Sequence, residues 1–457
     1  MGNSVEQATL ISRHSYHVPG KMQIEELLFE VPLDHSDPSR GTIRIFARSA
    51  KRSEPSNTGL PKPEQKPWLL WLQGGPGGGC PTPQSQERTP IFLDRGYQVL
   101  HMDQRGTGLS TPVTAATLAL RGGPEEQADY LKFFRADNIV RDAEAIRKFL
   151  TAEYPEDLKK WTIWGQSYGG YCSFTYLSLY PEGLREVFVS GGVPPIGKTV
   201  DQIYSKIFFQ TKKRNKAYYE KFPMDSRRIH TLIDHFDSKG GLALPSGGVL
   251  TGKRFLILGM NFGFKGGIQN THDLVLRMAT ELEQFGFITR PSLSIFEDLT
   301  SFDDHIIYAV LREAIYCDGM SSNWSAERVG ASMDEYNWIQ GARDPQRPIY
   351  FAGGMALPFI FDISPELQQL KEVAEILAGF AWPRLYDEEQ LRRNEVPLYT
   401  ASFVDDAYVD FQNVQDALEG VGNCKQLITN TMYHDAVRKD TKKLLNEMFA
   451  LKDDLLE

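Results

Sequence analysis

The sequence lacks the features that mark membrane, secreted and nucleic-acid-binding proteins. It contains no run of about 18 apolar residues, so no membrane-spanning segment is expected. Its N-terminus has no basic region followed by an apolar core, so no secretory signal is expected. Lysine and arginine form no dense block and the net charge is −9, which argues against nucleic acid or an anionic membrane as a partner.

Cysteine is scarce in this chain. The four cysteines are scattered, without the CxxC or Cys/His spacing of a metal site: Cys80, Cys172, Cys317 and Cys424. Structural or free thiols in a reducing compartment are therefore expected, and the protein is predicted to be cytoplasmic. The sequence does not indicate an oligomeric state.

The chain is long for a single compact core. Its 457 residues predict either one large domain with a substantial insertion or two domains. Hydrophobic residues make up 41% and aromatic residues 11% of the chain, as in ordinary folded proteins. The composition therefore predicts a folded protein with enough chain to bury a reaction site.

Strand-like and helix-like patterns alternate in the first part of the chain. Two strand-like stretches, 24–35 and 41–50, predict a hairpin, and the proline-rich segment 51–66 predicts a loop. A helical pattern covers 133–150. Continuous apolar runs typical of doubly buried strands stand at 67–73, 97–102, 161–165 and 184–190. This alternation predicts an α/β fold with a mostly parallel central sheet.

The pattern changes after Pro195. Residues 196–384 show helical patterning without the strand and helix alternation, which predicts a mainly helical insertion. A strand, a helix and a last strand follow between 394 and 435. The predicted domains are therefore a core in two parts, 1–195 and 385–457, and a helical cap domain, 196–384.

The stretch GQSYG, residues 165–169, carries the strongest chemical signal. A serine between two glycines, after an apolar strand and before a helix, predicts a nucleophile on a sharp turn. The glycines omit side chains that would crowd this turn, and the helix directs its positive end at developing negative charge. The alternative is a small residue in a glycine-rich loop. The context favours Ser167 as the nucleophile.

A nucleophilic serine needs a general base and an acid that orients it. In this class the chain order is serine, acid, histidine. His434 is the histidine that follows Ser167 within the resumed sheet region, whereas four others lie in the insertion: His230, His235, His272 and His305. The candidate acids are three aspartates after a predicted strand: Asp405, Asp406 and Asp410.

The glycine-rich loop GGPGGG, residues 74–79, predicts part of an oxyanion hole. Two backbone N–H groups must converge on the developing oxyanion. One is expected from Tyr168, the residue after the nucleophile, and the other from Gly75. Phosphate binding is the alternative, but the loop lacks the GK[ST] ending of a P-loop and the spacing of a dinucleotide fingerprint.

Four motifs together resemble the proline iminopeptidases, a branch of the α/β-hydrolases. They are QGGPGGG at 73–79, DQRGTGLSTP at 103–112, WGQSYGG at 164–170 and DDAYVD at 405–410. Other segments, including EAIYCDG within the predicted cap, resemble the longer form of this family, so the resemblance covers nearly the whole chain. It implies an α/β-hydrolase fold with a helical cap and a serine peptidase that needs no metal or cofactor.

The resemblance also implies roles for individual residues. Ser167, Asp406 and His434 match the triad, and the second aspartate of the DD pair is favoured over Asp405. Ala407 stands where the family usually has methionine. The implied partners are short peptides with a free N-terminal proline.

The family places acids for the substrate's free amine in the cap. The candidates here are Glu313 and Glu327, with Tyr316 and Trp324 as an apolar slot for the pyrrolidine ring. The alternative functions are an esterase or a broader-specificity aminopeptidase on the same fold. An epoxide hydrolase is disfavoured because it uses aspartate at the position of Ser167.

Overall fold

A computed structural model describes residues 5–53 and 65–454. Its central feature is a nine-stranded sheet with the order β1-β2-β3-β5-β4-β6-β7-β10-β11. Residues 54–64 of the proline-rich segment predicted as a loop lie outside the described residues. The mostly parallel sheet and the helices around it confirm the predicted α/β class.

The first three strands form an antiparallel edge of the sheet. β2 (Met22–Pro32) and β3 (Thr42–Arg52) pair antiparallel along their whole length, which confirms the predicted hairpin. β1 (Thr9–Val18) extends this edge, and the sequence did not predict it. Most of its side chains are exposed, so it lacks the buried face whose apolar pattern identifies a strand.

The remaining strands are mutually parallel. All but the edge strand β11 are almost completely buried, which explains their continuous apolar runs. They are β4 (Trp68–Leu72), β5 (Gln98–Met102), β6 (Trp161–Gln166), β7 (Leu184–Ser190), β10 (Leu398–Phe403) and β11 (Cys424–Thr429).

Helices cover both faces of this sheet. Side chains of β4 alternate between two hydrophobic clusters, because successive residues of a strand point to opposite faces. One cluster includes α4 (Ala136–Leu150) and α6 (Tyr168–Leu179), and the other includes α1 (Arg88–Asp94) and α20 (Thr441–Lys452). Shorter helices beside the sheet are α5 (Glu156–Lys159), α17 (Glu388–Arg392), α18 (Phe411–Leu418) and α19 (Ala436–Lys439).

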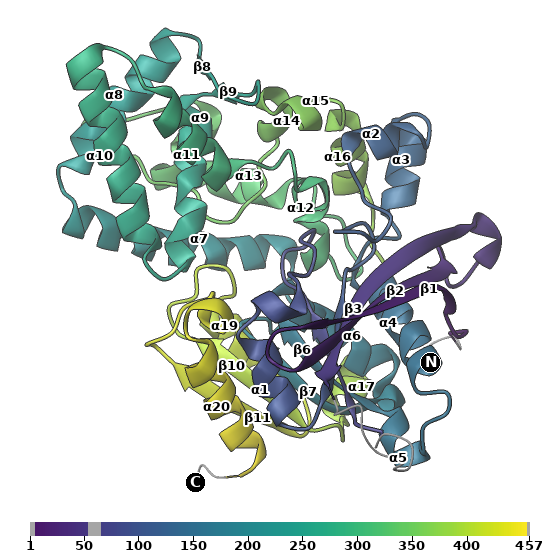
Figure 1. Cartoon of the computed structure of the whole chain (residues 1–457). Coiled ribbons are helices and arrows are strands. Elements are labelled where there is room, and N and C mark those ends of the chain that lie inside the picture. The colour runs from purple at the N-terminus through teal and green to yellow at the C-terminus, as the bar shows by residue number, and fades with distance from the viewer. Residues whose placement is uncertain (1–4, 54–64, 455–457) are drawn as a thin grey trace.

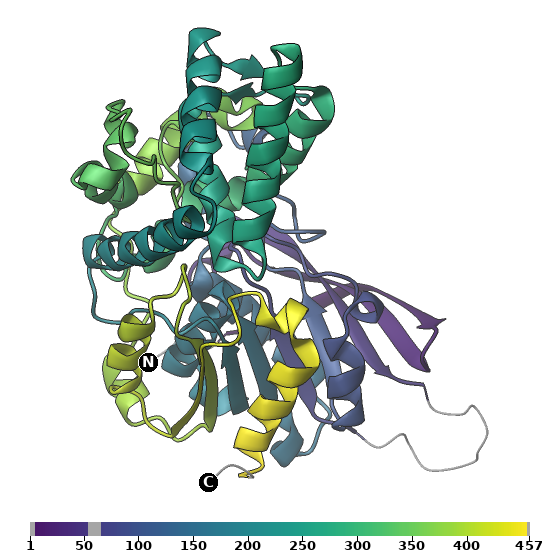
Figure 2. The same ribbon diagram turned by 90° about the vertical axis from the view of Figure 1, so that its left-hand side faces the viewer.

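A helical body stands over one end of the sheet (Figures 1 and 2). Most of it lies between β7 and β10 and begins at Thr199, which forms a reciprocal capping box with Gln202. Its longer helices are α7 (Val200–Lys221), α8 (Asp225–Ser238), α10 (Gly267–Phe285), α11 (Arg290–Thr300) and α16 (Lys371–Gly379).

Short elements complete this helical body. They are β8 (Leu242–Ala243), β9 (Val249–Leu250), α9 (Gly252–Phe255), η4 (Leu256–Gly263), α12 (Ile306–Leu311), η5 (Ala314–Tyr316), α13 (Ser325–Ala331), η6 (Asp334–Gln340), α14 (Ile360–Ile363) and α15 (Pro365–Gln368). Two helices from the first part of the chain, α2 (Ala115–Ala119) and α3 (Pro124–Leu131), also lie there, and α3 packs against α16 (Figure 1). The helical body therefore combines segments from two parts of the chain, and the division of the chain at 195 and 384 stays a prediction.

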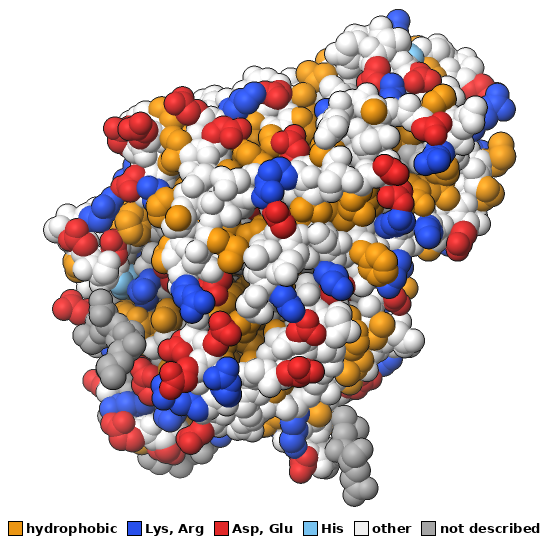
Figure 3. Space-filling model, turned by 180° about the vertical axis from the view of Figure 1, so that it is seen from behind, with side chains coloured by type: hydrophobic (Ala, Val, Ile, Leu, Met, Phe, Trp, Pro, Cys, Tyr) orange, Lys and Arg blue, Asp and Glu red, His pale blue; other side chains and the backbone are white. Residues whose placement is uncertain are grey.

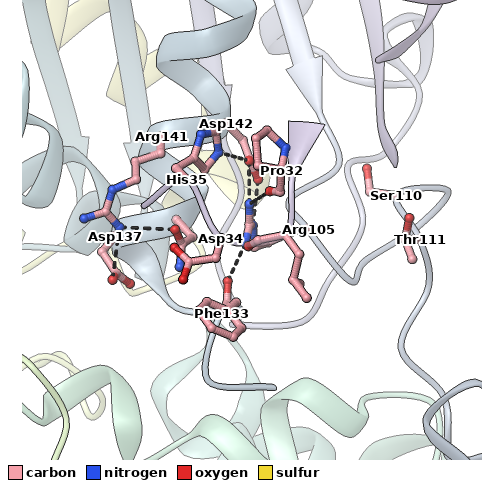
Figure 4. A network of polar contacts seen from close by, with 12 residues as sticks. Pro32, Asp34, His35, Arg105, Ser110, Thr111, Phe133, Asp137, Arg141 and Asp142 are labelled. Carbon is pink, nitrogen blue, oxygen red and sulfur yellow. Dashed lines mark hydrogen bonds and ion pairs between the residues drawn. The ribbon is translucent and has the colours of Figure 1, made fainter. Parts of the chain in front are cut away.

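A buried polar network joins the loop after β5 to α4 and to the end of β2 (Figure 4). The Arg105 guanidinium donates to both carboxylate oxygens of Asp142, at 2.7 and 2.6 Å, and to the carbonyl of Phe133 at 2.7 Å. The ring of His35 lies 2.8 Å from the same carboxylate. This network fixes the loop after β5, which borders the glycine-rich loop.

The outer surface carries charges of both signs. On the face shown in Figure 3, basic and acidic side chains are interspersed rather than gathered by sign. Among the described residues, no helix has the length and apolar character needed to cross a membrane.

Candidate active site

Ser167 occupies a strained turn between β6 and α6. Its backbone has φ 54° and ψ −122°, a conformation that is uncommon for a residue with a side chain. Two backbone bonds hold it there: its N–H donates to Ser190 at 3.0 Å, and its carbonyl accepts from Gly170 at 2.7 Å. This is the geometry expected of a nucleophile elbow, in which the hydroxyl stands clear of the backbone.

The glycines around Ser167 are required by close backbone approach. A Cβ atom on Gly169 would lie 2.0 Å from the carbonyl oxygen of Leu72, and one on Gly165 would lie 2.3 Å from that of Gly169. Real Cβ atoms do not come this close to backbone oxygen. The motif therefore reflects tight packing of the start of α6 against β4 and β6.

A continuous hydrogen-bonded relay joins three side chains. His434 Nε2 lies 2.9 Å from Ser167 Oγ, and His434 Nδ1 lies 2.7 Å from Asp406 Oδ2. The second oxygen of Asp406 accepts the N–H groups of Tyr408 at 2.8 Å and Val409 at 3.1 Å. Both carboxylate oxygens are thus engaged, which fixes the orientation of the imidazole.

The relay assembles at the carboxyl edge of the parallel strands. Ser167, Asp406 and His434 follow β6, β10 and β11, respectively. Reacting groups of open α/β sheets collect at this edge. His434 and Asp406 are 7% and 1% exposed, so the electrostatic coupling between them is little screened by water.

The other two candidate aspartates do not contact His434. Asp405 is exposed. Asp410 caps α18, where it accepts the N–H of Asn413 at 3.0 Å and a hydrogen bond from the Gln210 side chain at 2.8 Å. The structure therefore brings only Asp406 of the three within hydrogen-bonding distance of the imidazole.

The glycine-rich loop lies directly against the elbow. A Cβ atom on Gly74 would come within 3.0 Å of the Cβ of Ser167, and Gly75 has φ 136°, a value that favours glycine. Gly74, Gly75 and Tyr168 all line the cavity in front of the serine. The structure thus brings both predicted oxyanion residues to the same cavity as Ser167.

That cavity has a volume of about 220 Å³ and opens between the sheet and the helical body. Its walls are mainly aromatic and apolar, with two arginines, and contain no aspartate or glutamate among the described residues. They comprise Gln73, Gly74, Gly75, Gln166, Ser167, Tyr168, Tyr171, Met260, Phe264, Tyr308, Arg312, Ile315, Tyr316, Tyr408, Val409, His434 and Arg438.

Of the four predicted substrate-binding residues in the cap, only Tyr316 lines this cavity. Glu313 is buried and accepts the N–H groups of Ser325 at 3.1 Å and Ala326 at 2.8 Å, at the start of α13. Burial raises the pKa of its carboxyl group above the ordinary value. Unpaired N–H groups at a helix start attract the nearest acceptor, and this places the Glu313 carboxylate away from the cavity.

The other two cap candidates also lie elsewhere. The Trp324 indole donates to Glu375 at 2.8 Å. Glu327 borders a separate surface hollow with Arg328 and Gln340. Of these four residues, the structure therefore places only Tyr316 in the wall of the Ser167 cavity. The Glu313 carboxylate is held by N–H groups at the start of α13, and the Trp324 indole by Glu375.

Two residues that the sequence did not single out contribute to the cavity. The ring of Tyr408 lies 4.7 Å from the His434 imidazole, measured between centroids, and its hydroxyl donates to the Met260 carbonyl. Arg312 comes from the end of α12 and is 5% exposed. Tyr408 belongs to the DDAYVD motif and follows Asp406 by two residues, so the sequence did contain a signal that could have identified it as a site residue. Arg312 directly precedes the EAIYCDG segment, but no pattern in the sequence assigned a role to it.

No metal-binding cluster is evident near the site. Among residues 5–53 and 65–454, no group of three or more His, Cys, Asp and Glu side chains has the arrangement needed to hold a metal ion. The chemistry that the described side chains support is acyl transfer through a serine.

Comparison with known proteins shows extensive similarity. Residues 67–236 match the family model for the alpha/beta hydrolase fold. The chain is 41% identical over 455 residues to Proline iminopeptidase aneH of Aspergillus aculeatus, covering 99% of both chains. It is 37% identical over 442 residues to the proline iminopeptidase of Aeromonas sobria, covering 96% of this chain and 99% of the relative.

A solved structure is also similar. The proline iminopeptidase of Mycobacterium smegmatis aligns with a TM-score of 0.42 at 12% identity, covering 90% of this chain and 95% of the solved one.

Proposed function

This chain belongs to the proline iminopeptidase family of α/β-hydrolases, and we propose that it releases proline from short peptides with a free N-terminal proline. The observation that carries the proposal is the relay from Ser167 through His434 to Asp406, open to a cavity at the serine. A serine, a base and an orienting acid in this geometry are the parts that acyl transfer needs.

The first half of the reaction forms a prolyl-enzyme. His434 Nε2 accepts the proton of the Ser167 hydroxyl as its oxygen attacks the prolyl carbonyl carbon. Asp406 keeps the proton of the imidazole on Nδ1 and stabilises the imidazolium that forms. The imidazolium then donates its Nε2 proton to the leaving amine as the peptide bond breaks, and the shortened peptide departs.

The second half returns the enzyme to its starting state. A water molecule gives a proton to His434 and attacks the ester carbonyl of the prolyl-enzyme. The tetrahedral intermediate collapses, Ser167 Oγ takes back the proton from His434, and proline leaves. The peptide and one water molecule are consumed, and proline and the shortened peptide are released.

The backbone amides of Gly75 and Tyr168 are proposed to bind the oxyanion. Tyr168 opens α6, so its N–H belongs to the positive end of that helix. Preorganised donors of this kind stabilise charge that develops only in the transition state, and removing one typically lowers kcat about 10²–10³-fold.

The cavity suits a small apolar residue beside the serine. Tyr316, Ile315, Met260 and Phe264 from the helical body and Tyr408 from the core present apolar surface for a pyrrolidine ring. Because no described carboxylate lines the cavity, the proposed contacts of the substrate's free amine are tyrosine ring faces and oxygens rather than an acid.

All four cysteines are free thiols in the structure: Cys80, Cys172, Cys317 and Cys424. Burial raises the pKa of the Cys172 thiol, which makes it less reactive. Free, unreactive thiols are consistent with the proposed cytoplasmic compartment, where disulfides are rare.

The proposal is tested with proline 2-naphthylamide and its N-acetyl derivative. The purified protein is expected to cleave the free amine form, and Ser167→Ala is expected to lower kcat at least about 10⁴-fold. Ser178→Ala removes a hydroxyl on the same helix that bonds only to the Phe174 carbonyl, so it serves as the matched control. Equal turnover of the N-acetyl compound would contradict an aminopeptidase and favour an acyl hydrolase that ignores the amine.

A further inference from the structure

Arg312 is a buried cation in the wall of the Ser167 cavity. Its side chain is 5% exposed, and its Nε donates to the Gly354 carbonyl at 2.9 Å. The guanidinium lies over the rings of Tyr308 and Tyr316, 5.4 and 5.0 Å from their centroids. Among the described residues, no carboxylate comes within ion-pair distance of it, which distinguishes it from the paired Arg105.

Burial out of water penalises a guanidinium. The contacts of Arg312 are the Gly354 carbonyl, the faces of two tyrosine rings and a hydrogen bond with the Tyr316 side chain, so all of them are with neutral groups and none is with an anion. Arg312 lines the cavity that receives the substrate. An anionic group on the substrate can therefore reach this guanidinium.

The charge of the cavity points the same way. Its wall holds a second guanidinium, Arg438, which is exposed at the mouth, and it holds no described aspartate or glutamate. Arg438 forms no ion pair with a described residue; its guanidinium lies 5.8 Å from the Phe264 ring centroid. The whole chain carries a net charge of −9, so this positive cavity is a local feature and not a consequence of overall composition.

We propose that the cavity binds a carboxylate on the residue that follows proline, with Arg312 as the specificity-determining residue. This inference rests on the proposed function. In a dipeptide Pro-Xaa, the C-terminal carboxylate is only two bonds from the nitrogen that His434 protonates, so it stays within the same small cavity. Arg438, four residues beyond His434, extends the positive wall toward the exit.

The size of the cavity supports a short substrate. Its volume of about 220 Å³ is below the range of about 300–1,000 Å³ that is usual for ligand pockets. A proline and one further residue fill such a space, whereas a longer peptide has to extend through the mouth. The favoured substrates are therefore dipeptides with a free C-terminus. A side-chain carboxylate of a following Asp or Glu has the same chemistry and is the second source to be tested.

The experiment compares kcat/KM for matched substrates with the full-length protein. Pro-Gly against Pro-Gly-NH2 tests the C-terminal carboxylate, and Pro-Glu-NH2 against Pro-Gln-NH2 tests a side-chain carboxylate. We expect the wild-type protein to prefer at least one carboxylate-bearing partner by tenfold or more, mainly through KM. In Arg312→Met, the ratio within that pair is expected to fall toward one. A ratio within one variant cancels any general loss of folded protein.

Two further variants complete the test. Arg254→Met is the matched control, because Arg254 is also a buried arginine without an ion pair but does not line the cavity. Its ratio is expected to equal that of the wild type. Arg312→Lys, which retains the charge, is expected to keep part of the preference and serves if Arg312→Met fails to fold.

Two results would overturn the inference. One is a wild-type ratio near one for both substrate pairs, and the other is a ratio that Arg312→Met leaves unchanged. If the protein still cleaves proline 2-naphthylamide, either result contradicts only this inference and not the proposed peptidase function. Absence of turnover of proline 2-naphthylamide overturns the function together with this inference.

Discussion

The phenol ring of Tyr408 lies against the imidazole of His434, with centroids 4.7 Å apart and planes inclined by 58°. Its hydroxyl donates to the carbonyl of Met260, which belongs to η4 of the helical body. A Cβ atom on Gly263 would lie 2.1 Å from the Tyr408 ring. One side chain thus links the proposed general base to the docking of the helical body.

Replacing Tyr408 tests this link. Tyr408→Ala is expected to lower kcat at least about tenfold, because the imidazole loses the surface that holds its orientation and small misplacements strongly slow catalysis. Tyr408→Phe keeps the ring and loses one hydrogen bond, so it is expected to lower stability by about 1 kcal/mol with kcat changed little. Steady-state kinetics and thermal unfolding measure the two effects. Equal kcat in both variants and the wild type would show that the ring does not position His434.

Neighbouring aspartates offer a sharp test of the orienting acid. Asp406→Asn is expected to lower kcat about 10⁴-fold, because the amide cannot hold the imidazole in the required tautomer. Asp405→Asn is the matched control and is expected to leave kcat unchanged, since Asp405 is exposed and does not contact His434. Kinetics on proline 2-naphthylamide check both, with circular dichroism to verify folding. A large loss of kcat in Asp405→Asn, with little loss in Asp406→Asn, would show that Asp406 is not the orienting acid.

The elbow glycines are expected to tolerate no side chain. In Gly169→Ala, the new Cβ would lie 2.0 Å from the Leu72 carbonyl oxygen, so the variant is expected to lose about 3 kcal/mol or more of stability. Gly379→Ala in α16 is the control, because the nearest atom to its Cβ is 4.0 Å away, and a stability change within about 1 kcal/mol is expected. Urea unfolding measures both. If Gly169→Ala were as stable as the wild type, β4 and α6 would have to be less closely packed than the structure shows.

The buried pair of Arg105 and Asp142 (Figure 4) should make stability depend on acid pH. Burial raises the pKa of Asp142, but the charge and hydrogen bonds of Arg105 and His35 lower it more, and the net pKa lies below the ordinary value of 3.8. The unfolded chain therefore binds this proton at a higher pH than the folded protein does. The stabilisation is fully present above about pH 4 and is lost as the pH falls through the folded-state pKa.

Asp142→Asn is expected to lower the free energy of unfolding by about 3–5 kcal/mol at pH 7, because Arg105 loses its anion. The variant should also lose less stability than the wild type on acidification. Asp129→Asn, which breaks the exposed pair with Arg40, is the control and should change stability by less than about 1 kcal/mol. Urea unfolding of both variants and the wild type between pH 7 and pH 3 measures these changes in the free energy of unfolding. Parallel pH profiles for wild type and Asp142→Asn would contradict this role of the carboxylate.

Much of the fold was predictable because burial leaves a pattern in the sequence. β4 and β6 are buried on both faces and stand out as apolar runs, and α4 shows its buried stripe at helical spacing. The exposed strand β1 has no such pattern. Its place in the sheet depends on backbone pairing with β2, which almost any side chains permit.

The site divides in the same way. The residue types of the relay and their order along the chain follow from GQSYG, the aspartates after β10 and the single histidine near the C-terminus of the sheet region. The choice of Asp406 over Asp405 rested on resemblance to a family until its distance to His434 was known. Glu313 could not be excluded from the substrate pocket by its sequence context, because the N–H groups that hold it belong to a helix start twelve residues further on.

The sequence by itself determined the α/β core, the serine turn and the family to which the chain belongs, because these depend on local pattern and on motifs of few residues. Only the tertiary structure decided what surrounds the serine: Tyr408 against the base, Arg312 without an anion, and an absence of acids among the described residues of the cavity wall. The physical reason is that these contacts arise where the helical body meets the sheet. Each joins segments distant in the chain, and their energies depend on distances and burial that no local pattern encodes.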